Sequence, residues 1–284
     1  MVSRTNGHTP LTAGGVRRPD FVDSLAKGLQ LLAAFERDAA LSNAELADLT
    51  ALPKATVSRL TGTLVTLGYL QRDEDSRKYV VGARVLGFGA SLQRHMRLQR
   101  AARPLMQALA DRLDISIVLG TRDGTRIVLL EVARPPHNRL TVNNDIGSYV
   151  PLATTAMGLA YLVAAPVNAR ARLLAELQRS HVGDWAAVRE RVERAHAERE
   201  RQRFVVSMES RGGTLGAVGV PLVLDRGRVF TFSAVGPAFD LSRLRLTRVA
   251  GPALVETVDR IALGLGGAVA SAVAPARARI RALA

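Results

Sequence analysis

The chain contains 284 residues with a formal charge of +14, 48% hydrophobic residues and no cysteine. This length suffices for two ordinary domains, and this hydrophobic content excludes a chain that is mainly disordered. The lack of cysteine excludes disulfides and thiolate chemistry, and no apolar run reaches the roughly 20 residues of a membrane-spanning helix.

The positive charge favours a polyanionic partner such as nucleic acid, because clustered cations attract phosphates and release their counterions. Among the 39 basic residues only Lys27, Lys54 and Lys78 are lysines, so a coding bias toward arginine explains the charge almost as well. Residues 1–20 are polar and predict a flexible N-terminal arm. They lack the apolar stretch of a signal peptide, which favours a cytoplasmic protein.

Two helices are predicted after this arm. The first spans about residues 23–37, with an inward apolar stripe of Leu25, Leu29, Leu32 and Phe35. The second begins after Ser42, because Ser42 and Glu45 have the spacing of a capping box, in which the two side chains satisfy each other's backbone amides. Its inward residues are expected to be Leu46, Ala47 and Leu49.

A third helix follows the short turn at residues 50–52. Pro53 is expected at its first helical position, where the missing amide hydrogen costs nothing, and Gly68 is expected to end it after Leu67. Residues 69–72 and 78–81 then predict two strands joined by a polar turn. Three helices and a hairpin predict a winged helix-turn-helix, mostly α with a β-hairpin wing, over residues 21–82.

A long helical pattern continues from about residue 83 to residue 113. We expect Pro104 to divide it, leaving a linker helix at 83–101 and the start of a second domain, which we place at 102–265. Basic side chains along this stretch are expected to form mainly a solvated face, with contacts to another subunit or to DNA as the alternative; they are Arg94, His95, Arg97, Arg100 and Arg103.

The second domain mixes strands with helices. Strands are predicted at 115–120, 125–132, 139–142, 204–207, 215–224 and 228–235, and helices at 152–164, 168–179, 185–201 and 241–263. Several strands are joined by hairpin turns, so the pattern predicts an α+β domain around a largely antiparallel sheet. Residues 266–284 are expected to be a flexible tail.

The third helix has two chemically different faces. Val57, Leu60, Leu64 and Leu67 recur three and four residues apart, and we expect them to pack on the first two helices. The opposite face carries small and polar residues: Ala55, Ser58, Arg59, Gly62 and Thr66, with Lys54 at its start. A scattered polar face of an ordinary exposed helix is the alternative interpretation.

The exposed face suits the DNA major groove. Arg59 can donate two hydrogen bonds to a guanine edge, and the small Ala55 and Gly62 permit close approach. The helix N-terminus near Lys54 and Thr56 favours a phosphate. The complete set of predicted DNA-binding residues is Ser42, Lys54, Ala55, Thr56, Ser58, Arg59, Gly62, Arg72, Arg77 and Lys78.

These segments resemble the IclR family of bacterial transcription regulators. The resemblance is carried by Ser24-Leu-Ala-Lys-Gly-Leu-Gln-Leu-Leu32, Asn43-Ala-Glu-Leu-Ala47, Leu52-Pro-Lys-Ala-Thr-Val-Ser-Arg-Leu60 and Leu67-Gly-Tyr-Leu70. It continues more loosely at Val150-Pro-Leu-Ala-Thr-Thr-Ala-Met-Gly158 and Ser233-Ala-Val-Gly-Pro237, so it covers about residues 21–263.

The resemblance implies a GAF-like C-terminal domain that binds a small effector, often an organic or aromatic acid. It also implies homodimers or homotetramers on a palindromic double-stranded operator, with the chain acting as repressor or activator and needing no cofactor. The effector-binding positions that it implies are Leu140, Val142, Thr154, Thr155, Ala156, Met157, Ser207, Ala217, Ser233 and Val235. A helix start near residues 155–157 would offer free backbone amides to a carboxylate. Ser207, Ala217 and Val235 stand where members that bind small keto acids have an acidic residue, a cysteine and a serine, which implies a less polar pocket. Core packing around small residues is the alternative interpretation at each position.

Enzymatic interpretations have weaker support. The five histidines show no metal-ligand spacing, and the glycine-rich residues 212–216 lack the Lys-Ser/Thr of a phosphate-binding loop. Glu209 with Arg211 is more typical of a surface ion pair than of a catalytic pair. The alternative that remains is a small-molecule enzyme of α+β fold whose helical N-terminus mediates oligomerisation.

Overall fold

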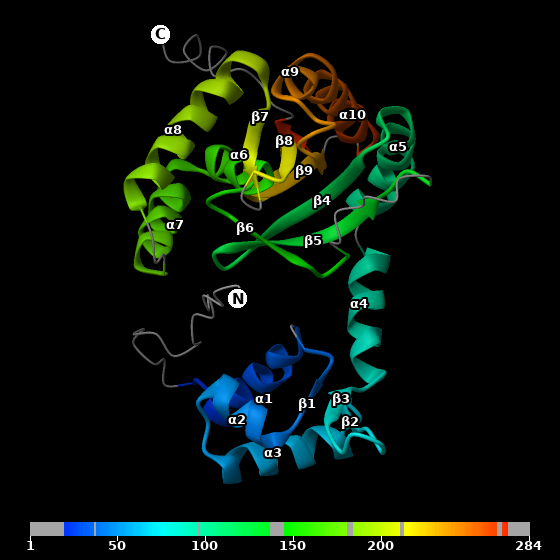
Figure 1. Cartoon of the computed structure of the whole chain (residues 1–284), viewed down its shortest axis with the longest axis vertical. Coiled ribbons are helices and arrows are strands. Elements are labelled where there is room, and N and C mark those ends of the chain that lie inside the picture. The colour runs from blue at the N-terminus through cyan, green and yellow to red at the C-terminus, as the bar shows by residue number, and fades with distance from the viewer. Residues whose placement is uncertain are drawn as a thin grey trace. The chain divides into compact units, whose positions relative to one another are not determined.

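The computed structural model describes residues 20–36, 38–95, 97–136, 145–180, 184–210, 213–265 and 269–271. The chain divides into two compact units, residues 1–95 and 96–284, whose elements are labelled in Figure 1. The strand expected at 139–142 lies outside the described residues, as do the first 19 residues and most of the expected tail.

The N-terminal unit is a winged helix-turn-helix. Its elements are α1 (Asp23–Ala33), the 3₁₀ turn η1 (Ala34–Glu36), β1 (Ala40–Leu41), α2 (Asn43–Thr50), α3 (Lys54–Thr66), β2 (Leu70–Arg72), β3 (Tyr79–Val81) and α4 (Arg84–His95). The antiparallel strands lie in the order β1-β3-β2, so the predicted hairpin gains a short third strand that the sequence analysis missed.

The core of this unit lies under the second half of α1. Leu31 is fully buried and Phe35 nearly so, whereas Leu25 and Leu29 are 61% and 54% exposed. The predicted stripe was therefore wrong at Leu25 and Leu29 and confirmed at Phe35 and at Leu32, which packs against the core, because the buried cluster includes this helix only from Leu31 onward. Leu49 and Leu67, also expected inside, are 46% and 47% exposed.

Two prolines occupy positions other than those predicted. Pro53 is the N-cap of α3 with an extended ψ of 139°, so Lys54 is the first helical residue. Pro104 lies inside α5 (Arg97–Leu113) and does not end it; the preceding helix α4 ends at His95. The exposed Pro104 is tolerated there because its ring lies on the solvent side and it removes only one backbone hydrogen bond.

The C-terminal unit is built on an antiparallel sheet. Its strands are β4 (Ser116–Asp123), β5 (Arg126–Ala133), β6 (Tyr149–Pro151), β7 (Val205–Ser210), β8 (Leu215–Leu224), β9 (Arg228–Pro237) and β10 (Val269–Ser271). The order is β10-β8-β9-β4-β5-β6, and β7 pairs with the first half of β8. The helices after α5 are α6 (Ala156–Ala164), α7 (Val167–Ser180), α8 (Trp185–Gln202), α9 (Arg243–Arg245) and α10 (Gly251–Gly264).

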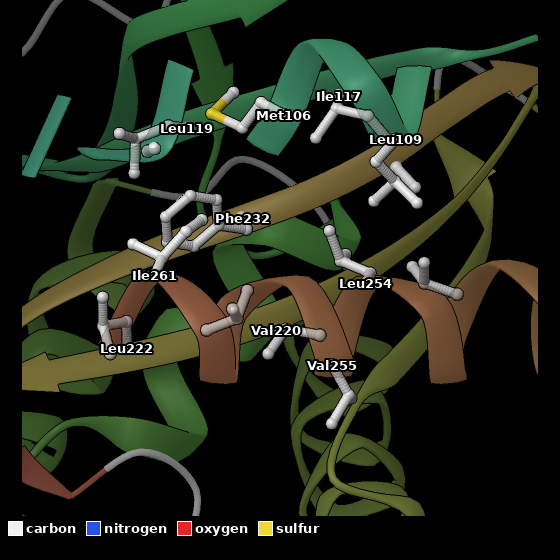
Figure 2. Close-up of a cluster of buried hydrophobic side chains, with 14 of the residues drawn as sticks. Met106, Leu109, Ile117, Leu119, Val220, Leu222, Phe232, Leu254, Val255 and Ile261 are labelled. Carbon is white, nitrogen blue, oxygen red and sulfur yellow. The ribbon is translucent and has the colours of Figure 1, made fainter. Parts of the chain in front are cut away.

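Helices cover both faces of this sheet, which gives the predicted α+β class. One face packs against α5 and α10 around Met106, Leu119, Phe232 and Leu254, and Figure 2 shows these side chains meeting between the strands and α10. The other face packs against α6, α7 and α8 in a second cluster that contains Val118, Met157 and Val205.

Several boundaries differ from the prediction. The helix expected at 241–263 is divided into α9, a π-helical turn η3 (Leu246–Ala250) and α10. The strands β6 and β10 were not predicted, and β10 lies within the segment expected to be a flexible tail. Helix α6 begins at Ala156 because Thr155 caps it, four residues after the predicted start.

Candidate nucleic-acid interface and ligand site

The turn between α2 and α3 is held by local hydrogen bonds. Ser42 Oγ accepts from the Glu45 backbone amide at 3.3 Å, and Glu45 Oε2 accepts from the Ser42 amide at 2.7 Å, so the predicted capping box is present. Ala51 ends α2 in the left-handed conformation with φ of 55°. Gln30 Nε2 on α1 donates to the Thr50 carbonyl at 3.1 Å, which ties the turn to α1.

A buried threonine fixes α3 against α2. Thr61 has no exposed surface, and its hydroxyl lies 3.1 Å from Asn43 Oδ1 and 3.0 Å from the Val57 carbonyl oxygen. Val57 and Leu64 flank it in the core. The sequence analysis missed Thr61, because a single polar residue within an apolar stripe gives no periodic signal.

The opposite face of α3 is open to solvent. Lys54, Ala55, Ser58, Arg59, Gly62 and Thr66 are exposed, and Thr56 is half-buried. Gly62 has nothing within 4 Å of the position that a Cβ would take. Among the described residues, no acceptor within hydrogen-bond distance of the Arg59 guanidinium is found. The face therefore presents Arg59 among small side chains, with Lys54 at the start of the helix.

The wing carries two exposed arginines and one lysine that is paired with a carboxylate. Arg72 and Arg77 are exposed, and Arg77 has a φ of 56° in the turn between β2 and β3. Lys78 instead donates to Glu45 Oε1 at 2.8 Å, which joins the wing to the capping box. Its predicted role as a DNA ligand thus competes with a structural role that the sequence did not indicate.

This ion pair changes the titration of Glu45. Hydrogen bonds from Lys78 and then from Ser42 lower the pKa of Glu45 from 4.5 to about 2. A carboxylate whose pKa is lower in the folded than in the unfolded state stabilises the fold above the unfolded value. That contribution is lost as the pH falls from 4.5 toward 2.

We expect Glu45→Gln to flatten the acid dependence of the N-terminal unit, because glutamine keeps the capping geometry but loses the ion pair. The protection factors of the amides in α2 and α3 of the full chain, measured by hydrogen exchange, should fall less between pH 5 and pH 3 in this variant than in the wild type. Glu74→Gln in the exposed wing turn is the control. Equal acid sensitivity of the Glu45 variant and the wild type would contradict the assignment.

The start of α4 is joined to the end of α3. Arg84 Nη1 donates to the Leu67 carbonyl at 3.1 Å, and its guanidinium lies 5.5 Å from the centre of the Tyr69 ring. The Tyr69 and Phe88 rings stack with centroids 5.9 Å apart. Helices α3 and α4 therefore belong to one packed unit. No sequence motif indicated this stack.

In the C-terminal unit, the predicted effector positions gather on one face of the sheet. Ser207 on β7 pairs with Ala217 on β8, which pairs with Val235 on β9, so these three residues form one row across neighbouring strands. Ser233 precedes Val235 by two residues on β9, so both point to the same face, and it pairs with Gly219 on β8. Leu140 and Val142 lie outside the described residues.

The start of α6 lies against this row. Ser207 Oγ donates to the Thr154 carbonyl at 3.3 Å, and Ala156 and Met157 are buried. Close approach is permitted by Gly219, because a Cβ there would lie 2.2 Å from the Ala156 carbonyl oxygen. The row and the start of α6 therefore lie against each other.

Polar groups in this region already have partners. Thr155 Oγ1 accepts from the Gly158 amide at 3.0 Å and donates to the Pro151 carbonyl at 2.8 Å, and Ser233 Oγ donates to the Val218 carbonyl at 2.8 Å. One fewer backbone amide is therefore free at the start of α6 than expected, because the Gly158 amide donates to the Thr155 side chain. Hydroxyl oxygens keep lone pairs that can accept from a ligand.

The arrangement defines a DNA-binding regulator: a winged helix-turn-helix joined to an α+β domain that has the fold of a ligand sensor. Residues 24–74 match the IclR helix-turn-helix domain, and residues 90–263 match the C-terminal domain of bacterial transcriptional regulator IclR. The chain belongs to the IclR family of transcriptional regulators.

Relatives and solved structures agree with this assignment. The chain is 46% identical over 242 residues to the HTH-type transcriptional regulator TsaQ1/TsaQ2 of Comamonas testosteroni, covering 84% of this chain and 87% of that protein. An IclR family regulator from Brucella abortus superposes with a TM-score of 0.81 at 35% identity, over 92% of this chain and 99% of that one.

A third comparison shows the fold alone. An IclR homologue from Microbacterium hydrocarbonoxydans, solved in complex with 4-hydroxybenzoate, has a TM-score of 0.66 at 22% identity over 86% of this chain and 99% of that one.

Within the described residues, no helix of this chain is long and apolar enough to cross a membrane.

Proposed function

We propose that the exposed face of α3 enters the major groove of an operator and reads it through Arg59. The observation that carries the proposal is an exposed arginine without a protein partner among the described residues, set between the small residues Ala55 and Gly62. A bidentate arginine distinguishes guanine from the other bases, and Ser58 can add a hydrogen bond to a base or a phosphate. Arg72 and Arg77 of the wing and Lys54 are assigned to phosphates, and Ser42 and Thr56 to the groove edge.

The operator is proposed to be palindromic and bound by a homodimer. Exposed leucines and Phe88 line a groove of about 830 Å³ that lies within the N-terminal unit. Its apolar lining includes Leu25, Leu29, Leu67 and Phe88, each of them more than 45% exposed. Thr56 and Arg59 also line this groove, so the second copy has to cover the leucines and Phe88 while it leaves Arg59 open. Such a copy would bury those apolar side chains and present two recognition helices to two half-sites.

The C-terminal unit is proposed to bind a small organic acid at the row of Ser207, Ala217 and Val235. This row is mainly apolar, and its polar groups are hydroxyl oxygens and backbone amides, which fits an acid with a hydrocarbon or aromatic body. A protein of the same fold holds 4-hydroxybenzoate. The ligand must bind one dimer arrangement more tightly than another in order to shift DNA binding.

The regulator is proposed to act in the cytoplasm, where the DNA is, and without catalysing a reaction. The relatives that support the assignment are regulators, and the IclR domains match across both units. The enzymatic alternative would need a set of catalytic side chains close together, and no observation on the described residues favours such a set.

Titration of the full chain against DNA from upstream of its own gene tests the DNA proposal. Observed affinity should fall steeply with salt, with a slope of about −0.9 for each phosphate neutralised. Failure to prefer this DNA over a scrambled duplex of equal length at physiological salt would contradict it.

The dimer proposal predicts a strong effect of Leu29→Glu. A charge on the apolar groove should lower affinity for DNA with two half-sites by about tenfold or more, because the second binding event loses its high effective concentration. Affinity for DNA with a single half-site should stay the same. Val167→Glu is the control, since Val167 is 70% exposed on α7 of the other unit. Unchanged binding to both DNAs would exclude this groove as the dimer surface.

A further inference from the structure

Arg170, His196 and Arg199 form a basic cluster where α7 and α8 meet the end of α6. Arg170 is the fourth residue of α7, and the other two lie three residues apart on α8, which runs beside α7 in Figure 1. Arg199 Nη1 donates to the Val163 carbonyl, near the C-terminus of α6, at 3.2 Å. Helix α6 has 9 residues, so its ends lie about 13 Å apart. Because the proposed effector row lies at the start of α6, the basic cluster is a separate place in the fold.

The histidine acts as an acceptor within the cluster. Arg170 Nη1 lies 3.1 Å from His196 Nε2. A guanidinium can only donate, so His196 Nε2 accepts and the imidazole proton is on Nδ1. His196 Nδ1 faces Glu200 Oε1 at 3.9 Å, and the Glu200 side chain is 55% exposed. A neutral histidine therefore satisfies one donor of Arg170 and balances none of its charge.

The two arginines of the cluster repel each other. Burial lowers the pKa of Arg199, the charge of Arg170 lowers it further, and Glu200 raises it. The Arg199 Nε–H is buried and has no hydrogen-bond partner among the described residues. The C-terminal end of a helix carries only about half an elementary negative charge, so α6 offsets less than one of the two arginines. In the described part of the chain, no ion pair of either arginine is found.

We propose that the basic cluster binds a small oxyanion, a phosphate or a carboxylate group, between Arg170 and Arg199. Each guanidinium presents its N–H donors in a planar fork that matches two oxygens of such a group. Both arginines are half-buried, so a solute can reach them while water screens their charges less than on an open surface. A bound anion would offset their repulsion and hold α7 against α8. This site is additional to the proposed effector row and does not depend on it.

Thermal unfolding of the full chain at constant ionic strength tests the site. The probes are inorganic phosphate and sodium acetate, each compared with sodium chloride. Arg170→Gln is the first variant. Arg170→Lys keeps the charge but not the planar fork, and it carries the decision if the glutamine variant does not fold. Arg199→Gln is less suitable, because it also removes the hydrogen bond to Val163.

The matched control is Arg172→Gln. Arg172 is exposed on the same helix and lies about 200° around it from Arg170, and its substitution changes the charge by the same amount. A general effect of surface charge would therefore appear in both variants, whereas a site at the cluster would be affected by Arg170 alone.

We expect phosphate or acetate to raise the unfolding temperature of the wild type more than chloride does. The apparent affinity for that anion should fall roughly tenfold in Arg170→Gln, as loss of a charge-assisted contact predicts, and by less in Arg170→Lys. It should stay unchanged in Arg172→Gln. A response to phosphate alone identifies a phosphate-bearing ligand, and a response to acetate identifies a carboxylate.

Four outcomes would overturn the proposal. Phosphate also stabilises proteins by exclusion from their surfaces, so equal stabilisation of the wild type and the Arg170 variants would show that no site is involved. An equal loss in Arg172→Gln would show a general effect of charge. Absence of stabilisation by both anions would exclude the site. A greater loss of affinity for a scrambled duplex in Arg170→Gln than in Arg172→Gln would assign the cluster to DNA phosphates instead.

Discussion

Replacing Arg59 with alanine should weaken operator binding by about tenfold to a hundredfold. A bidentate arginine–guanine contact contributes roughly 1–3 kcal/mol of discrimination, and Arg59 is the basic residue at the centre of the exposed face of α3. The fold should not change, because no hydrogen bond or ion pair of the Arg59 side chain is found among the described residues. Fluorescence anisotropy with specific and scrambled duplexes measures the effect.

A conservative change separates charge from base reading. Arg59→Lys keeps the positive charge but lacks the planar fork, so it should retain affinity for scrambled DNA and lose preference for the operator. Arg72→Ala provides the opposite control: loss of a phosphate contact should weaken binding to both duplexes and reduce the salt slope by about 1. An unchanged preference for the operator in Arg59→Ala would show that another residue reads the sequence.

Replacing Gly219 with alanine should destabilise the C-terminal unit by about 3 kcal/mol. A Cβ at this position would lie 2.2 Å from the Ala156 carbonyl oxygen and 2.6 Å from its carbon, both backbone atoms of α6. Neither atom can rotate away, so α6 must shift from β8, and added atoms in a packed interior typically cost 1–3 kcal/mol or more. Chemical denaturation that resolves the two units measures the loss.

The control for this substitution is Gly264→Ala. Gly264 ends α10, and nothing lies within 4 Å of the place that its Cβ would occupy, so the change should alter stability by about 0.5 kcal/mol or less. Because α6 forms one wall of the proposed effector region, Gly219→Ala should also lower any stabilisation by organic acids. A Gly219 variant as stable as the wild type would show that α6 and β8 are not packed this closely.

Helices α2 and α3 were predictable because local rules suffice for them. The Ser42 and Glu45 spacing predicted the cap of α2, and the i, i+3, i+7 pattern of Val57, Leu60 and Leu64 separated the inner face of α3 from the outer one. The strands β8 and β9 were predicted for the same reason, since a tight turn and long apolar runs define a hairpin. These features depend on neighbours in the sequence.

Features that depend on distant partners were not predictable. The apolar residues of α1 occur on more than one side of the helix, so periodicity alone could not tell that Leu31 is buried and that Leu25 and Leu29 are exposed. The short strands β6 and β10 exist only through pairing with β5 and β8. The ion pair of Lys78 with Glu45 joins residues 33 positions apart and leaves no motif.

Electrostatic roles were the hardest to assign from composition. Arginine is frequent throughout the chain, so no single arginine is distinguished by its type. The structure separates those that pair with an acid, such as Arg203 with Asp259 at 2.7 Å and Arg243 with Glu198 at 2.8 Å, from Arg59 on the open face of α3. Position relative to buried acids therefore decides the role.

Guanine methylation interference on the operator tests the central claim most directly. Methylation at N7 places a methyl group in the major groove, where Arg59 is proposed to donate its hydrogen bonds. Two short clusters of guanines about one helical turn apart should block binding when methylated, and the Arg59→Ala variant should lose this sensitivity at one guanine in each cluster. Interference confined to adenine N3 in the minor groove, or sensitivity that is identical in the variant, would contradict recognition by α3.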